Sequence, residues 1–128
     1  MQIFHGVDLV EISSFEKLLA DPENHFLTRC FLPSEVTDAG TGPNRSAKLA
    51  ARFAAKEAVM KALGTGFSAG IGFQDIRIES LGSGAPIAKL QGNAAAKAEA
   101  LGISAWALST SHDGGYAIAS VIGYGVIA

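Results

Sequence analysis

The sequence predicts an α+β fold, in which a mainly antiparallel sheet packs against one long helix and several shorter helices. A segment dense in Ala, Lys, Glu, Leu and Met runs over residues 47–63 and predicts the long helix. Two short segments rich in β-forming residues flank Asp113-Gly114-Gly115, a turn sequence typical of hairpins. Of the 128 residues, 48% are apolar and 17% are charged, so we expect one globular domain over residues 1–128.

The first half of the chain is predicted to form one strand followed by helices. Residues 2–10 are rich in Ile, Phe, Val and Leu, which predicts a strand. Apolar residues then recur at helical spacing over residues 12–19. A short helix is expected at 34–39, and the Gly- and Pro-containing stretch 39–46 is expected to be a loop. Gly64 is the expected stop of the long helix.

The second half is predicted to alternate strands with one helix. Strands are expected at 71–80 and 86–91, on either side of a Gly-Ser-Gly turn. A helix is expected from Asn93, which can cap it, to Leu101. The final two strands, 106–111 and 116–123, are expected to pair as a hairpin.

Composition excludes several classes of function. The net charge of −2 argues against general nucleic-acid binding. The single cysteine, Cys30, excludes an internal disulfide, and we expect it to be a small, partly buried hydrophobic residue. Residues 1–6 lack the features of a signal peptide, and no segment reaches the roughly 20 apolar residues of a membrane span. We therefore expect a cytoplasmic protein.

Glu57 breaks the pattern of the long helix. Leu49, Phe53 and Met60 form an apolar stripe, and the spacing places Glu57 in the same stripe. A carboxylate on such a face is costly unless a cation, a metal or a hydrogen-bond donor meets it. One explanation is an ion pair with Lys61, four residues later, and the other is a metal site.

Asp8 is a second anomaly, because it interrupts the apolar segment Val7-Asp8-Leu9-Val10. Strand alternation places it on the face opposite to Val7 and Leu9. A solvated outer face is one explanation, and a functional site is the other. Glu11 close behind can be explained as a residue that suits the start of a helix.

Cationic residues and a glycine-rich turn accompany these carboxylates. Arg52, Lys56 and Lys61 lie on the long helix, and Gly64-Thr65-Gly66 leaves its end. Carboxylates, cations and exposed backbone N–H groups suit a divalent metal shared with a pyrophosphate. Mg²⁺ takes one or two protein carboxylates and completes its shell with phosphates and water. The spacing of a nucleotide-binding P-loop is absent.

The segment Ser109-Thr110-Ser111-His112-Asp113 contains the residue types of a hydrolase. Neighbours on a strand point to opposite faces, so these residues cannot form a catalytic triad among themselves. His112 is then either a residue at the end of a hairpin or a contact for an anion.

Two segments in order resemble the signatures of the 4′-phosphopantetheinyl transferases. The first is Gly6-Val7-Asp8-Leu9-Val10-Glu11-Ile12, and the second is Arg52–Ala62 with its K-E-x-x-x-K centre. The exit Gly64-Thr65-Gly66 and the late Ser109-x-Ser111-His112 with Tyr116-Ala117 are similar to the short bacterial holo-(acyl-carrier-protein) synthase subgroup of this family. The resemblance runs from Gly6 nearly to the C-terminus and implies the fold of that family.

The resemblance implies an activity and the residues that carry it. The 4′-phosphopantetheine of coenzyme A would move to a serine of apo-acyl-carrier protein, giving 3′,5′-ADP and supporting fatty acid biosynthesis. Asp8 and Glu57 would hold Mg²⁺, and together with Lys61 they would form the catalytic group. The CoA-binding residues would be Arg52, Lys61, Gly64, Thr65, Gly66 and His112, with His112 at the nucleotide end. Either Glu57 or a water molecule on the metal could accept the serine proton.

The same resemblance implies a homotrimer in which CoA lies between neighbouring subunits, so that Asp8 and His112 could act from different chains. The family commonly carries Arg near the position of Ser14, where it meets the acidic helix of the carrier protein. Either Arg29 or Arg45 replaces it here, or the partner is an unusual carrier. A non-catalytic trimer that binds CoA or a nucleotide is the competing hypothesis. The presence of Asp8, Glu57 and Lys61 argues against it.

Overall fold

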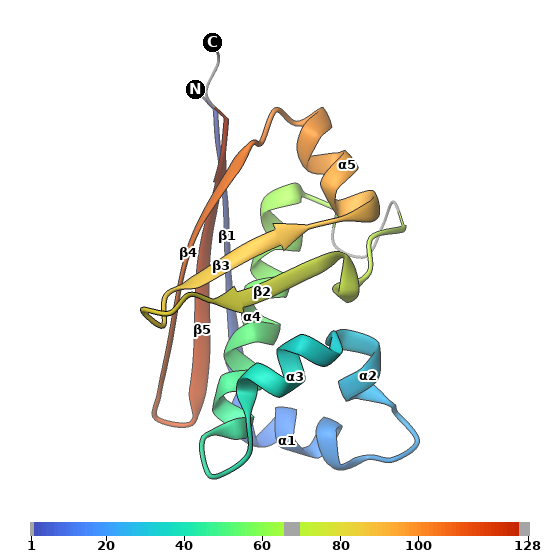
Figure 1. Ribbon diagram of the computed structural model, residues 1–128, viewed down its shortest axis with the longest axis vertical. Helices are drawn as coiled ribbons and strands as arrows, with labels where there is room; N and C mark the ends of the chain where they lie inside the picture. Colours follow the sequence, from blue (N-terminus) through green and yellow to red (C-terminus); the bar gives the residue numbers. More distant parts are fainter. Residues whose placement is uncertain (1, 66–69, 126–128) are drawn as a thin grey trace.

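The computed structural model describes residues 2–65 and 70–125. A three-stranded antiparallel sheet has the order β1-β5-β4, and a separate antiparallel pair joins β2 to β3. The long helix α4 lies between the two sheets (Figure 1). These elements are β1 (Ile3–Glu11), α4 (Arg45–Leu63), β2 (Ile76–Ser80), β3 (Pro86–Leu90), β4 (Ala105–Asp113) and β5 (Tyr116–Tyr124).

Shorter helices cover the two ends of α4. Three of them pack together around its N-terminal half, and α5 lies at the opposite end, near the chain termini (Figure 1). They are α1 (Ile12–Ala20), α2 (Phe26–Cys30), α3 (Pro33–Ala39) and α5 (Gly92–Ala100), and a 3₁₀ turn, η2 (Phe73–Asp75), precedes β2. The α+β class with mainly antiparallel pairing is therefore confirmed.

Several predicted boundaries were wrong for local reasons. The strand expected at 71–80 begins only at Ile76, because the Asp75 carboxylate accepts a hydrogen bond from the Gly72 N–H and closes the η2 turn. Helix α5 begins at Gly92, and the Asn93 side chain donates to the Gly70 carbonyl instead of capping it. Helix α2 was not expected, and α4 begins two residues early at Arg45.

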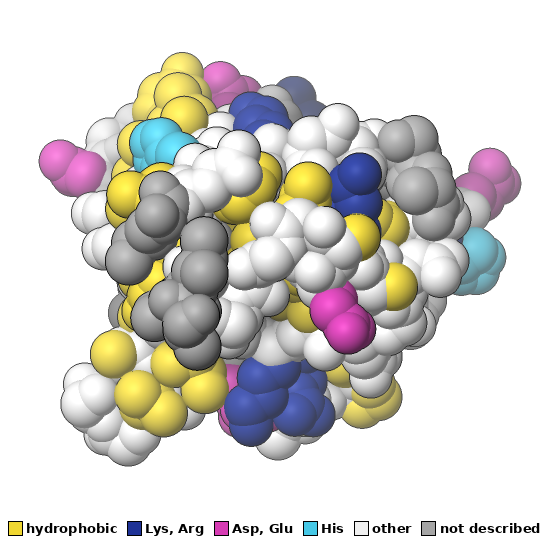
Figure 2. Space-filling view, turned by 90° about the horizontal axis from the view of Figure 1, so that it is seen from above, with side chains coloured by type: hydrophobic (Ala, Val, Ile, Leu, Met, Phe, Trp, Pro, Cys, Tyr) yellow, Lys and Arg dark blue, Asp and Glu magenta, His cyan; other side chains and the backbone are white. Residues whose placement is uncertain are grey.

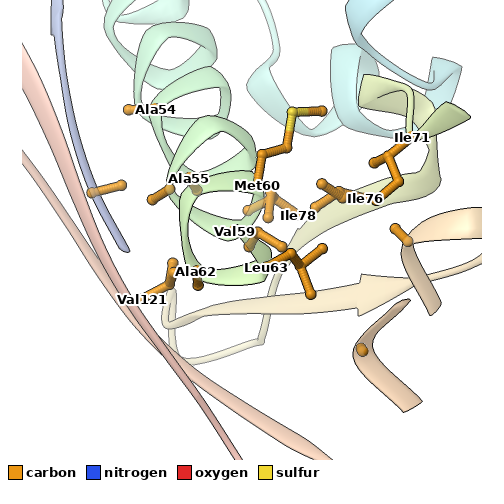
Figure 3. Close-up of a cluster of buried hydrophobic side chains, with 14 of the residues drawn as sticks. Ala54, Ala55, Val59, Met60, Ala62, Leu63, Ile71, Ile76, Ile78 and Val121 are labelled. Atoms are coloured by element: carbon orange, nitrogen blue, oxygen red, sulfur yellow. The ribbon is translucent and has the colours of Figure 1, made fainter. Parts of the chain in front are cut away.

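The main core forms where α4 meets both sheets. Its inward face carries mostly alanines with a few larger side chains, such as Val59, Met60 and Leu63, and they pack against Ile76, Ile78 and Val121 (Figure 3). Small side chains let the strands come close to the helix backbone, which sets the position of β1 described below.

The β4–β5 hairpin is confirmed at the predicted turn. Asp113 pairs with Tyr116, and Gly114 and Gly115 alone connect the strands with φ of 57° and 84°. Two positive φ angles in a row are typical of a type I′ turn and favour glycine at both positions.

The three-stranded sheet turns an apolar surface away from α4. We define the outer face by six exposed residues on alternate positions of β1 and β5: Ile3, Val7, Leu9, Tyr116, Ile118 and Ile122. Seen from the end where the termini lie, hydrophobic side chains gather on the side of this sheet (Figure 2). No helix within the described residues is long and apolar enough to cross a membrane.

Candidate functional site

Asp8 lies on the inner face of the sheet, beside α4. Its carboxylate accepts a hydrogen bond from Lys61 Nζ at 3.0 Å, and the same Nζ donates to the Val7 carbonyl at 3.0 Å. The Asp8 side chain is 15% exposed, so the explanation of a solvated outer residue was wrong. The apolar residues Val7 and Leu9 take the exposed face instead. The pattern of apolar residues therefore predicted that Asp8 and Val7 lie on opposite faces of the strand, but it did not predict which face is buried.

Glu57 lies close enough to Asp8 for their charges to interact. Burial raises the pKa of the Glu57 carboxyl, the charge of Asp8 raises it further, and Lys61 lowers it. In the part of the chain that the structure describes, the ion pair of Lys61 is with Asp8 and not with Glu57, so the simple helical pair was wrong. The structure thus brings together three predicted residues, and we call Asp8 and Glu57 the carboxylate pair.

Glycine at position 6 lets β1 pack close enough to α4 to bring the two members of the carboxylate pair together. A Cβ at Gly6 would lie 1.9 Å from the Ala58 carbonyl oxygen and 3.0 Å from the Ala62 nitrogen, both in the backbone of α4. Strand β1 can therefore rest directly on the helix only with glycine here. Two residues later, Asp8 reaches the turn of α4 that carries Glu57 and Lys61.

We expect Gly6→Ala to push β1 away from α4. Overpacking of this kind costs roughly 1–3 kcal/mol, which corresponds to a Tm lower by roughly 3–12 °C for a domain of this size. Because Asp8 moves with the strand, its ion pair with Lys61 should weaken as well. Thermal unfolding measures the first effect, and Gly72→Ala is the control, since a Cβ at Gly72 meets nothing within 4 Å. An unchanged Tm for Gly6→Ala would contradict the close packing.

The carboxylate pair has the composition of a Mg²⁺ site. Mg²⁺ is usually held by one or two protein carboxylates, and substrate phosphates and water supply the other ligands. Two neighbouring carboxylates share one cation, Lys61, so a divalent ion would relieve the repulsion that raises the pKa of Glu57. Within residues 2–65 and 70–125, no cluster of three or more His, Cys, Asp or Glu side chains could hold a metal by itself. The donors fit an ion that a substrate helps to bind.

Lys56 is a structural residue, contrary to its prediction as part of an anion-binding cluster. Its side chain is fully buried, and Nζ donates to Glu35 Oε1 at 2.7 Å, to the Cys30 carbonyl at 2.7 Å and to the Phe73 carbonyl at 3.0 Å. Burial lowers the pKa of Lys56, and Glu35 opposes that effect. Lys56 therefore joins α4 to the ends of α2 and η2 and to α3.

Cys30 is a buried packing residue, as predicted. Burial raises the pKa of its thiol to about 11. The thiolate, which is the reactive form, is therefore scarce at neutral pH.

Arg52 and His112 line a cavity of about 400 Å³ between α4, the β2–β3 pair and β4. We call it the Arg52 cavity, and its polar lining consists of Asp38, Lys48, Arg52, Ser80, Thr110 and His112. The size lies within the range of small-molecule sites. His112 faces α4 beside buried Ala117, whereas its neighbour Ser111 points to the other side of the sheet. These positions exclude a triad of sequential residues. The other prediction, that His112 contacts an anion, remains, and the cation Arg52 lines the same cavity.

The Arg52 cavity and the carboxylate pair lie on opposite sides of α4. Glu57 and Lys61 follow Arg52 by five and nine residues, which corresponds to rotations of roughly 140° and 180° around the helix. Lys61 reaches β1 at one edge of the sheet, whereas the cavity includes β4 at the other edge. One chain therefore does not bring together all the residues that were predicted to share a site.

The turn after α4 is only partly described. Gly64 ends the helix with a φ of 76°, and its N–H donates to the carbonyls of Met60 and Lys61, as expected for a C-cap glycine. Thr65 follows it, and Gly66 lies outside the described residues.

Sequence reasoning missed Lys48, Ser80 and Thr110 in the cavity. Lys48 precedes Arg52 by four residues, so helical spacing alone could have placed both cations on one face. Ser80 and Thr110 carried no such signal, because their position depends on how the two sheets pack around α4.

Comparison with known proteins places these features in a family. Residues 5–121 match the model of the 4′-phosphopantetheinyl transferase superfamily. The holo-[acyl-carrier-protein] synthase of Trichlorobacter lovleyi is 43% identical over 117 residues, covering 91% of this chain and 93% of that protein. The enzyme of the same name from Anaeromyxobacter sp. strain K is 43% identical over 120 residues and covers 91% of each chain.

Solved structures agree with this result. A holo-[acyl-carrier-protein] synthase from Helicobacter pylori in complex with coenzyme A superposes with a TM-score of 0.81 at 34% identity, covering 94% of this chain and 99% of the other. A Chronobacterium ammoniagenes synthase–CoA complex gives a TM-score of 0.84 at 33% identity, covering 99% and 100%.

Proposed function

Because the chain belongs to the 4′-phosphopantetheinyl transferase superfamily, we infer that it transfers the 4′-phosphopantetheine group of coenzyme A to a serine of apo-acyl-carrier protein. The products are holo-carrier protein and 3′,5′-ADP. The chain is thus an enzyme, a phosphopantetheinyl transferase. The observation that carries this function is the meeting of Asp8, Glu57 and Lys61 where β1 rests on α4.

We propose that the carboxylate pair holds Mg²⁺ together with the pyrophosphate of CoA. The ion supplies positive charge to phosphate oxygens when bound. Lys61 lies beside the pair and is 54% exposed, so its ammonium group can reach a phosphate while it still contacts Asp8. The carboxylate pair and Lys61 would in this way position the pyrophosphate and balance its charge, which is the main source of acceleration in phosphoryl transfer.

The transfer itself makes one bond and breaks one. The serine oxygen of the carrier protein attacks the β-phosphorus of CoA, and the bond from that phosphorus to the bridging oxygen breaks. The bridging oxygen leaves with its electron pair on 3′,5′-ADP. The serine proton must go to a base, and either Glu57 or a water molecule on the metal could accept it.

We propose that the outer face joins copies of this chain into a homotrimer. Contiguous exposed apolar patches mark association surfaces. On this face Leu9 lies opposite Ile118, and the two are 61% and 41% exposed. Ile3 and Val7 extend the patch along β1, with 62% and 45% exposure.

The trimer would also complete the site. The carboxylate pair and the Arg52 cavity lie at different edges of the sheet, so a ring of copies can bring the pair of one chain to the cavity of its neighbour. Such head-to-tail contacts close into rings when the rotation between copies allows it. CoA would then lie between two subunits, with its pyrophosphate at Asp8 and Glu57 and its nucleotide end at Arg52 and His112 of the next chain.

In this proposal the first helix, which would receive the carrier protein, has little positive charge. The resemblance to the family implies an Arg near the position of Ser14, and the Ser14 hydroxyl donates to Glu11 Oε1 at 2.6 Å. The bonds from Ser14 and Ser13 lower the pKa of Glu11, which keeps that carboxylate charged. Basic residues elsewhere, such as Arg29 or Arg45, would have to attract an acidic carrier.

We further propose that residues 1–128 form one domain, act in the cytoplasm and serve fatty acid biosynthesis.

Mass spectrometry of the carrier protein tests the proposed function. We expect incubation with CoA, Mg²⁺ and apo-acyl-carrier protein to add one phosphopantetheine to the carrier and to release an equal amount of 3′,5′-ADP. Chelation with EDTA should stop the reaction, and added Mg²⁺ should restore it. A carrier of unchanged mass in Mg²⁺, when a known transferase modifies the same preparation, would overturn the proposal.

A further inference from the structure

Arg52 enters its cavity in a fixed orientation with one unused donor. Its Nη1 donates to the Lys48 carbonyl at 3.2 Å, and Nη2 donates to Ser80 Oγ at 3.3 Å. Among the described residues, Arg52 Nε is buried and has no hydrogen-bond partner. A buried donor without a partner destabilises the protein, and an acceptor on a bound ligand would remove that cost.

Lys48 brings a second permanent cation to the same cavity. It precedes Arg52 by one helical turn, so both side chains leave the same face of α4. Lys48 is exposed, and no ion pair in residues 2–65 and 70–125 occupies its ammonium group. Arg52 likewise has no ion pair in this region, although Asp38 contributes a carboxylate to the lining.

The charge of the cavity matches a phosphate monoester. Such a group carries about −1.5 to −2 at pH 7, because its second pKa is about 6. Arg52 alone supplies one permanent positive charge. The Asp38 carboxylate in the same lining offsets the charge of Arg52, so Lys48 gives the cavity the net positive charge that attracts a dianion. The 3′-phosphate is the monoester of CoA, and 3′-dephospho-CoA carries a hydroxyl in its place.

We propose that Lys48 is a specificity-determining residue that selects the 3′-phosphate of CoA. The proposal rests on the transferase function, because it identifies the nucleotide end of CoA as the occupant of the Arg52 cavity. Arg52 and His112 orient the phosphate, and Lys48 completes its charge balance. Asp38 lies in the same lining, where its carboxylate disfavours a second anion and can accept a hydrogen bond from the nucleoside.

Steady-state kinetics with CoA and 3′-dephospho-CoA test this role. We expect Lys48→Ala to lower kcat/KM for CoA about 10-fold, mainly by raising KM. This factor corresponds to the loss of one charge-assisted contact. The value for 3′-dephospho-CoA should stay the same, so the preference between the two substrates falls by the same factor. Lys48→Arg should restore most of the preference. Lys97→Ala removes the same charge from α5, outside the cavity lining, and should change neither value.

A binding measurement separates this proposal from the function on which it rests. Calorimetry should show that Lys48→Ala weakens 3′,5′-ADP about 10-fold and leaves 5′-AMP unchanged. This result would stand even if the wild-type protein transferred nothing to a carrier. Equal losses for both substrates and both nucleotides would mean that Lys48 supports the cavity without reading the phosphate, and unchanged CoA and 3′,5′-ADP values would exclude it from the site. Either result would overturn the proposal.

Discussion

Replacing either member of the carboxylate pair by its amide should abolish transfer while leaving the protein folded. Asp8→Asn and Glu57→Gln keep the shape of each side chain and remove the charge that would hold Mg²⁺. We expect kcat/KM to fall by about 10²–10³-fold or more, the usual cost of losing a group that stabilises charge in a transition state. The carrier-mass assay measures this loss. Glu99→Gln on α5 is a control that removes one carboxylate far from the pair.

Glu57→Gln should also make the metal-free protein more stable. The pKa of Glu57 is raised in the folded state, so this carboxyl binds more protons in the folded chain than in the unfolded chain between its two pKa values. Stability therefore falls as pH rises through that window, and at neutral pH the ionised carboxylate carries the full cost. The amide removes the cost, and we therefore expect Tm in EDTA to rise. Near-normal turnover of either amide variant in saturating Mg²⁺ would contradict the metal assignment. A lower Tm for Glu57→Gln would contradict the repulsion within the pair.

The fold was predictable wherever a local signal was strong. The Ala-rich helix ending at Gly64 and the turn of Gly114 and Gly115 both formed as expected. Helix α2 gave no such signal, because five residues are too few for a clear period and it begins after His25 in the left-handed conformation. Its position depends on contacts with the preceding helix α1 and with η2, which is distant in sequence.

The site was predictable in its residues but not in its arrangement. Two carboxylates out of pattern, Asp8 and Glu57, pointed to the place where β1 meets α4. The sequence could not tell which of the three predicted cations, Arg52, Lys56 and Lys61, serve that place. Lys56 proved to be buried against Glu35, Lys61 pairs with Asp8, and Arg52 lines a cavity on the opposite side of the helix. Those outcomes depend on which elements surround each face of α4.

A divided site predicts that two inactive variants restore each other. Glu57→Gln keeps an intact Arg52 cavity, and the double variant Arg52→Ala/His112→Ala keeps an intact carboxylate pair. Each alone should be inactive, because every site in its ring lacks one half. In mixed rings, a site forms wherever the carboxylate pair of the double variant meets the cavity of Glu57→Gln. With equal random mixing, about one quarter of the contacts have this order in a head-to-tail ring.

The measurement is the rate of carrier modification after the two variants are unfolded together and refolded at equal concentration. The proposed division of the site predicts recovery to as much as about one quarter of the rate of wild-type protein treated in the same way. Mixing Glu57→Gln with Asp8→Asn should recover nothing, because both changes lie in the same half of the site. If the first mixture remains as inactive as its parts, while native mass spectrometry shows that mixed rings have formed, then a single chain holds the whole site and the division proposed here is wrong.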